Sequence, residues 1–240
     1  MKSKDLAAAP DLAVIPPGDF FMGGIEEDKF VTAVELPRHL VTFERGFAMA
    51  KTPVTRNQWM LLMGSPPPGE AHGLHGECPV VNVTFHEANG YLRELSAAFG
   101  ENYRLPSEAE WEYTCRAGSV TVFPHGGSLD IGDANFLYDE LGNPVGCGQA
   151  TPVGQYPPNP LGLFDLLGNV CEWTADAWHP DYVGAPCEGS AWSDHGKSGC
   201  RTIRGGAWDH LPRVLRASWR DWAPEQSHWD NLGFRVALSL

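Results

Sequence analysis

The chain has 240 residues, of which 42% are apolar and 20% charged, and its formal net charge is −13. This length predicts one large domain or at most two small ones, and the composition excludes a disordered chain. The acidic balance argues against nucleic acid and against an anionic membrane as partners, because both favour a basic surface.

The first fifty residues predict β-strands. Residues 13–15 and 19–22 form short apolar runs on either side of a Pro-Pro-Gly turn. Residues 40–43 follow with alternating character, which is typical of a strand with one buried face.

Helices are predicted from their N-terminal caps. Thr55 precedes a run with Trp59 on its apolar side. Thr84 and Glu87 fit a capping box, which opens a helix that Gly100 can end.

A further capping box begins at Ser107, and its helix should end near Gly118. Beyond it we expect short strands and loops, because the chain holds 27 glycines and 20 prolines, which interrupt regular structure. Helices in the first half of the chain and an irregular second half indicate an α+β fold.

No repeat or linker divides the chain, so we expect an N-terminal tail of residues 1–11 and a single domain of residues 12–240.

The expected location is cytoplasmic. Residues 1–20 contain three prolines and no continuous apolar run, which argues against a signal peptide, and no stretch of 18 apolar residues predicts a transmembrane helix. The six cysteines are then expected to be free thiols. Pairing of Cys187 with Cys200 stays open, since it would need an oxidising compartment.

Ordered motifs along nearly the whole chain resemble those of one known family. The longest are RLPSEAEWEY at residues 104–113 and GLFDLLGNVCEW at residues 162–173. Shorter ones are RGGAW at residues 204–208 and NLGFR at residues 231–235. With these motifs the chain resembles the sulfatase-modifying factor, or formylglycine-generating enzyme, family.

The resemblance implies a loop-rich variant of the C-type-lectin-like fold, with a groove built mainly by residues 204–235. In authentic members, two cysteines five positions apart, shortly after the Gly-Gly motif, bind copper(I). With oxygen they oxidise a cysteine of a target sulfatase to formylglycine. Soft thiolates suit copper(I), so this chemistry depends on those two side chains.

This chain departs from the family at those two positions. The first cysteine would fall at or near His210 and the second at Leu215, and no cysteine follows Cys200. Ala207 stands where the family has serine, and Cys171 stands where it usually has tryptophan. We therefore expect neither copper binding nor formylglycine generation.

An iron site is not expected either. Another branch of the family uses three histidines, partly from an extra N-terminal domain for which this chain has no room. The nine histidines show no HxH or HxxxH pair on a predicted helix. His72 and His75 lie in a Gly/Pro loop, where a solvated pair is the more ordinary interpretation than a metal site.

Calcium is the cofactor that the resemblance implies. The family pattern places its oxygen ligands at Asp165, Gly168, Val170 and Glu172, and Ca²⁺ prefers several oxygens from carboxylates and backbone carbonyls. The alternative is that Asp165 and Glu172 cap turns or pair with arginines.

The segment from Trp208 to Asn231 holds four tryptophans, two histidines and three arginines. Tryptophan and arginine dominate binding hot spots. Some positions resemble the family scaffold and are expected to be buried or paired with acids such as Glu112 or Glu172. These are Trp208, Arg216, Arg220 and Arg235. The positions expected to face a ligand are Asp209, His210, Trp222, His228, Trp229 and Asp230.

Binding is the first functional hypothesis: a module that presents this groove to a peptide, a protein or a small molecule. Some members with this fold are variable proteins of diversity-generating retroelements, and the polar and aromatic mix of the segment is compatible with that role. The alternative is an enzyme with changed chemistry, a metal- and oxygen-dependent oxidase or maturase. Its catalytic candidates are His210, His228 and Cys171. A third hypothesis is an accessory subunit that docks on a partner enzyme.

Overall fold

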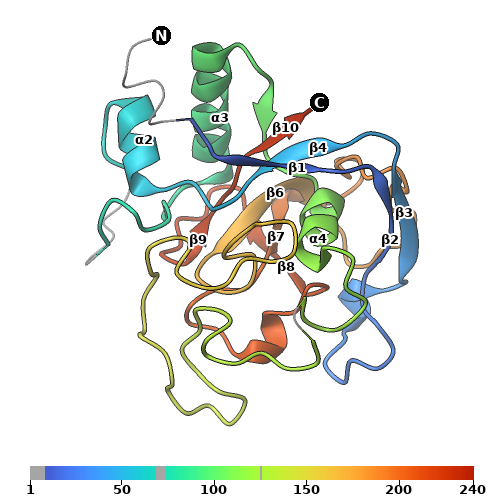
Figure 1. Ribbon diagram of the computed structural model, residues 1–240. Helices are drawn as coiled ribbons and strands as arrows, with labels where there is room; N and C mark the ends of the chain where they lie inside the picture. Colours follow the sequence, from blue (N-terminus) through green and yellow to red (C-terminus); the bar gives the residue numbers. More distant parts are fainter. Residues whose placement is uncertain (1–8, 69–73, 125) are drawn as a thin grey trace.

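The computed structural model describes residues 9–68, 74–124 and 126–240 (Figure 1). The α-helices in this part of the chain are α2 (Arg56–Met63), α3 (Phe85–Phe99) and α4 (Glu108–Arg116). Each begins after a capping box, so the helix starts predicted from Thr55, Thr84 and Ser107 are confirmed. Helix α3 ends at Gly100, whereas α4 ends at Ala117, one residue before the expected glycine.

Strands from both ends of the chain meet in one antiparallel sheet (Figure 1). Its order is β1 (Leu12–Ile15), β4 (Phe47–Ala50), β10 (Ala237–Ser239) and β5 (Tyr103–Arg104). The neighbouring ribbon of β2 (Gly18–Met22) and β3 (His39–Phe43) is antiparallel and pairs Phe21 with Leu40. These strands confirm the expectation for the first fifty residues.

The second half contains longer strands than expected. A four-stranded sheet runs in the order β8 (Arg220–Pro224), β7 (Lys197–Arg204), β6 (Cys171–Trp178) and β9 (Leu232–Gly233). Strands β6 and β7 have eight residues each. Strand β6 is buried at every position except Ala175, so its sequence lacks the alternation that identifies a strand with one exposed face.

Two hydrophobic clusters fill the interior. One packs Trp111 of α4 against residues of β1 to β4, among them Ile15 and Phe43. The other packs Tyr91 of α3 against Trp173 of β6 and the side chains around it. Together the elements form a mixed α+β domain with many loops, as the composition predicts.

Buried arginine–carboxylate pairs join segments that are far apart in the sequence. Arg204 Nη2 lies 2.5 Å from Glu112 Oε2, and Arg235 donates two hydrogen bonds of 2.7 Å to the carboxylate of Glu172. All four side chains are almost completely buried. Burial of an ion pair is tolerated only where the partners satisfy each other's hydrogen bonds, so the pairs fix how the segments meet.

Two further pairs attach the C-terminal segment to the rest of the domain. Arg216 donates to both oxygens of Glu35, at 2.7 and 2.8 Å, and also to Asp28. Arg220 donates to both oxygens of Glu108, at 2.7 and 2.8 Å. The 3₁₀ helix η1 (Ala33–Glu35) therefore supplies a partner that lies 181 residues from Arg216 in the sequence.

The scaffold role predicted for Arg216, Arg220 and Arg235 is confirmed. Glu172 is the partner of Arg235, as one of the expected acids. The other expected acid, Glu112, pairs instead with Arg204.

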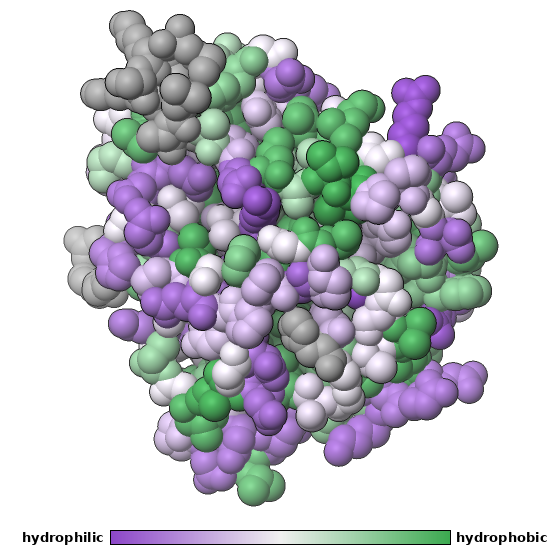
Figure 2. Space-filling view, in the orientation of Figure 1, coloured by the Kyte–Doolittle hydropathy of each residue, from purple (hydrophilic) through white to green (hydrophobic). Residues whose placement is uncertain are grey.

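Surface hydropathy and helix length bear on membrane contact. The face in Figure 2 shows hydrophobic residues in small groups among hydrophilic ones. None of the helices in the described ranges has the length and hydrophobicity that crossing a bilayer requires.

Replacement of Glu112 by glutamine tests the buried pairs. The Glu112 carboxylate accepts hydrogen bonds from Arg204, Arg116 and the backbone of Gly23. The variant removes the counter-charge of buried Arg116 and leaves Arg204 only Glu108, at 3.7 Å. We therefore expect urea unfolding to show a loss of about 3–5 kcal/mol in the free energy of unfolding.

The matched control is Asp11→Asn, which removes the exposed partner of Lys51. It should change stability by less than about 1 kcal/mol. Equal effects of the two substitutions would contradict a structural role for the buried pair.

Candidate functional site

A cavity of about 600 Å³ opens beside the segment that follows the Gly-Gly motif. Its walls come from residues 138–142, from the turn before the 3₁₀ helix η2 (Pro212–Val214), and from the start of β8. The lining residues are Tyr138, Gly142, Asp209, His210, Leu211, Val214, Trp219 and Asp221. Its volume falls within the usual range for small-molecule sites.

His210 is held in a defined tautomer at this cavity. The backbone N–H of Ala207 donates to His210 Nδ1 at 3.2 Å, so the neutral ring carries its proton on Nε2. Burial lowers the pKa of His210, although Asp209 and Asp221 act in the opposite direction. The ring lies edge-on to Trp219, with 5.8 Å between centroids. His210 therefore presents a hydrogen-bond donor and an aromatic surface, and its Nε2 has no lone pair for a metal or a proton.

Two carboxylates flank the ring. Asp209 accepts hydrogen bonds of 2.9 and 3.1 Å from Asn231 and lies 3.9 Å from His210 Nε2. Asp221 is exposed and accepts from the backbone N–H of Trp222 at 2.8 Å. The described lining of the cavity contains no lysine, arginine or cysteine, so its formal charge is negative.

The structure places two of the six predicted ligand residues, Asp209 and His210, at this cavity. Trp222 is not among the lining residues. Consecutive residues of a strand point to opposite faces, and in this strand Asp221 faces the cavity. Lys197 Nζ lies 3.1 Å from the centroid of the Trp222 ring. Trp208, expected to be buried scaffold, is half-buried.

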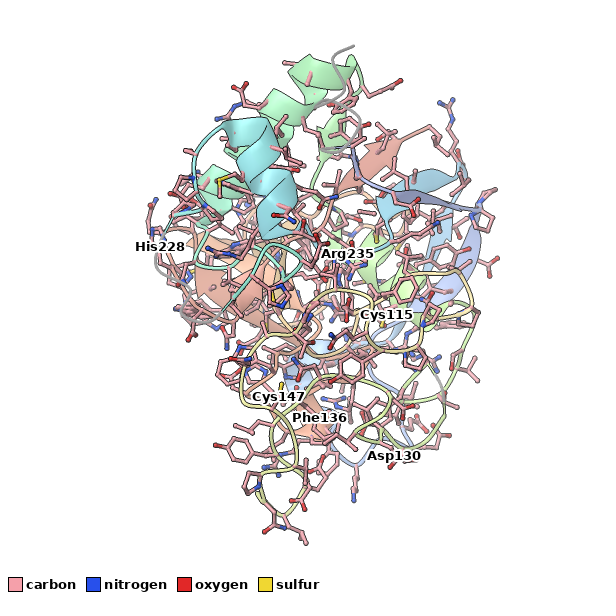
Figure 3. The ribbon with its side chains drawn as sticks, turned by 60° about the vertical axis from the view of Figure 1, so that its left-hand side comes forward. Cys115, Asp130, Phe136, Cys147, His228 and Arg235 are labelled. Carbon is pink, nitrogen blue, oxygen red and sulfur yellow. The ribbon has the colours of Figure 1, made fainter. Side chains whose placement is uncertain are left out.

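The other predicted ligand residues lie against the start of α3. His228 Nδ1 donates to the carbonyl of Asn82 at 2.8 Å, and the carbonyl of Trp229 accepts from Asn82 N–H at 3.0 Å. Trp229 and Asp230 are exposed. Figure 3 shows His228 at one margin of the molecule, far from Phe136 and Asp130. His228, Trp229 and Asp230 are not among the residues that line the cavity at His210.

Cys171 lies in β6 and packs within the second hydrophobic cluster. Burial raises the pKa of its thiol well above the usual value, and Asp209 and Asp221 raise it further. Burial and a raised pKa both favour the protonated thiol, which is a poor nucleophile and a poor metal ligand.

The four predicted calcium ligands do not form a free set of oxygens. Both oxygens of Glu172 are engaged, by Arg235 and by Trp111 Nε1 at 2.9 Å. The same guanidinium donates to the backbone carbonyl of Asp165 at 3.2 Å. The alternative of pairing with an arginine therefore holds for Glu172. Calcium binding at these four residues stays a prediction.

Asp165 keeps one unusual feature. Its Oδ2 accepts from Gly154 N–H at 2.7 Å, while its buried Oδ1 has no hydrogen-bond partner. Burial is the main cause that raises its pKa to about 6. An unpartnered buried carboxylate oxygen is costly, so this residue makes stability depend on pH.

No other metal site is evident in the described ranges, which hold no group of three or more His, Cys, Asp or Glu side chains placed to bind a metal. The pair of His72 and His75 cannot be assessed, because His72 lies outside the described residues. Cys187 and Cys200 are both free thiols, the first exposed and the second buried.

A second cavity, of about 480 Å³, was not foreseen from the sequence. Its lining includes Phe30, Phe123, Phe136 and Asp130. Figure 3 labels Phe136 and Asp130 in the lower part of the molecule. Pro212 lines this cavity and its neighbour Leu211 lines the other, so both cavities border the same segment. The sequence signal was weak, because residues 120–150 show no hydrophobic periodicity.

Comparison with known proteins agrees with the fold and the motifs. The family model for the sulfatase-modifying factor enzyme 1-like domain matches residues 1–240, and the chain belongs to this family. The structure of PvdO from Pseudomonas aeruginosa is similar over 98% of this chain and 97% of that one, with 33% identity and a TM-score of 0.88. The expected family and α+β fold are thereby confirmed.

Other similarities are narrower. The serine/threonine-protein kinase Pkn1 of Chlamydia caviae is 36% identical over 168 residues, which cover 68% of this chain and 24% of the kinase. The chain thus matches about a quarter of the length of this curated relative. Treponema denticola variable protein 1 has a TM-score of 0.75 and 21% identity, with 95% of each chain covered, and this likeness shows the fold alone.

Thiol reactivity tests the placement of Cys171. Exposed Cys147 and Cys187 should be alkylated by iodoacetamide in the native protein at pH 8, whereas Cys171 should react only after unfolding. Peptide mass spectrometry before and after denaturation gives the measurement. Native labelling of Cys171 at the rate of Cys147 would contradict its burial.

Replacement of Asp165 by asparagine tests the unpartnered oxygen. Between about pH 4 and pH 6 the folded state binds more protons at Asp165 than the unfolded state, so this group stabilises the fold at low pH and the benefit is lost as the pH rises through about 6. Asparagine keeps an acceptor for Gly154 and carries no charge. We expect the variant to gain stability relative to wild type at pH 8 compared with pH 5, in urea titrations. An identical difference at both pH values would contradict the shifted pKa.

Proposed function

We propose that this protein is a ligand-binding member of the sulfatase-modifying factor family that does not generate formylglycine. The observation that carries the proposal is the cavity at His210, the position where the first copper ligand of the family is expected. It presents imidazole, carboxylate and aromatic groups. The second expected position, Leu215, is fully buried in the first hydrophobic cluster.

The chemistry of the lining favours binding over catalysis. His210 offers a donor at Nε2 rather than a base, because Ala207 N–H occupies Nδ1. Cys171, which lies in the strand beneath this segment, is protonated and enclosed. The remaining groups, Tyr138, Trp219 and Asp221, can stack on a ligand and hydrogen-bond to it.

The experiment combines metal analysis, an activity assay and a binding screen on the purified full chain. Incubation with copper(I), oxygen and a cysteine-containing sulfatase peptide should give no aldehyde by mass spectrometry. In a fragment screen followed by protein NMR, the fragments that bind should shift the signals of Tyr138, His210 and Trp219. The control is Glu94→Gln on the exposed face of α3, which should leave the fragment affinities unchanged.

Two results would contradict the proposal. One is aldehyde formation on the peptide. The other is stoichiometric copper or iron in the purified protein that is lost on His210→Ala, which would indicate the alternative, an enzyme of this family with metal- and oxygen-dependent chemistry. Calcium in the same analysis would be assigned by whether Asp165→Asn removes it.

A further inference from the structure

We propose that the cavity at His210 selects a ligand that carries a positive charge, an amine or a quaternary ammonium group beside an apolar moiety. This inference rests on the proposed function and names the chemical class of the ligand. It follows from which side chains line the cavity and from which charged groups are already engaged elsewhere.

The negative side chains of the cavity are not neutralised by bases of its wall. Asp209 is bound by the neutral amide of Asn231, and Asp221 by a backbone N–H. The arginines of the neighbouring segments contact other acids, since Arg220 pairs with Glu108, Arg216 with Glu35 and Arg213 with Glu140 at 4.0 Å. A carboxylate with only neutral donors keeps its attraction for a cation, and solvent screens that attraction less at half-buried Asp209 than at exposed Asp221.

The aromatic side chains of the cavity also favour a positively charged ligand. Tyr138 and Trp219 line the same cavity as the two carboxylates, and Trp219 is half-buried. The ring face of tryptophan or tyrosine attracts cations, most strongly ammonium groups that have lost part of their water. In this protein such contacts already occur, with Lys197 over Trp222 and Arg220 over Tyr182.

An anionic ligand is disfavoured by the same geometry. It would meet Asp209 and Asp221 at close range, with the Nε2–H of His210 as its main donor. A neutral ligand would lose the electrostatic contribution and keep only the stacking. The cavity therefore discriminates by charge rather than by size.

Three probes of similar shape test the charge preference: benzyltrimethylammonium, its neutral isostere neopentylbenzene, and anionic phenylacetate. We expect the full chain to bind the ammonium probe about tenfold more tightly than the neutral one, as one cation–π or ionic contact supplies at a partly desolvated site. Phenylacetate should bind most weakly. Affinities come from NMR titration of the Trp219 indole signal, assigned with Trp219→Phe.

Variants locate the preference at the cavity. Asp221→Asn should lower the affinity for the ammonium probe about tenfold and leave that for neopentylbenzene unchanged, while Asp221→Glu should restore it. Glu94→Gln removes the same charge from the exposed face of α3 and should have no effect.

The outcomes separate this inference from the proposed function. Equal affinity for the ammonium and neutral probes, or no effect of Asp221→Asn, overturns the charge preference while the cavity stays a binding site. Failure of all three probes to perturb Trp219 overturns both.

Discussion

The domain depends on guanidinium groups that are buried together with their carboxylates. A chain with so many loops leaves backbone carbonyls outside any strand ladder, and buried carbonyls need donors. Arg204 donates to the carbonyls of Ala217, Ser218 and Trp219 as well as to Glu112. A single arginine thus neutralises an acid and satisfies loop backbone, which a hydrophobic residue could not do. These pairs decide where the loops run.

The same pairs explain how the site can change while the fold is kept. Arg204 and Arg216 anchor the two ends of the segment that contains His210, each to an acid from a distant part of the chain. His210, which lies between the anchors, is not a hydrogen-bond partner of Arg204 or Arg216. The side chain of His210 can therefore differ without removing a partner of the buried arginines.

Local features of the fold could be predicted, and long-range partners could not. Capping boxes such as Thr84 with Glu87 are read directly from a spacing of three residues. The partner of Glu172 lies 63 residues away, at Arg235, and no local pattern distinguishes a carboxylate that meets a guanidinium from one that meets a calcium ion. The ligand-facing residues could not all be predicted for the same reason. A run of polar and aromatic residues does not indicate which face of the molecule each side chain occupies. Asp221 and Trp222 are adjacent in the sequence, yet they point to opposite sides of β8.

The absence of cysteines after Cys200 does not by itself decide whether residue 210 binds a metal, because an imidazole is also a metal ligand. The deciding contact is the backbone N–H of Ala207, which donates to Nδ1 and leaves the proton of the neutral ring on Nε2. For Nε2 to bind a metal, that proton would have to move to Nδ1, where it would face another donor. The turn after the Gly-Gly motif thus sets the tautomer of the neutral His210 ring, and the proposed preference for a cation rests on the carboxylates beside it.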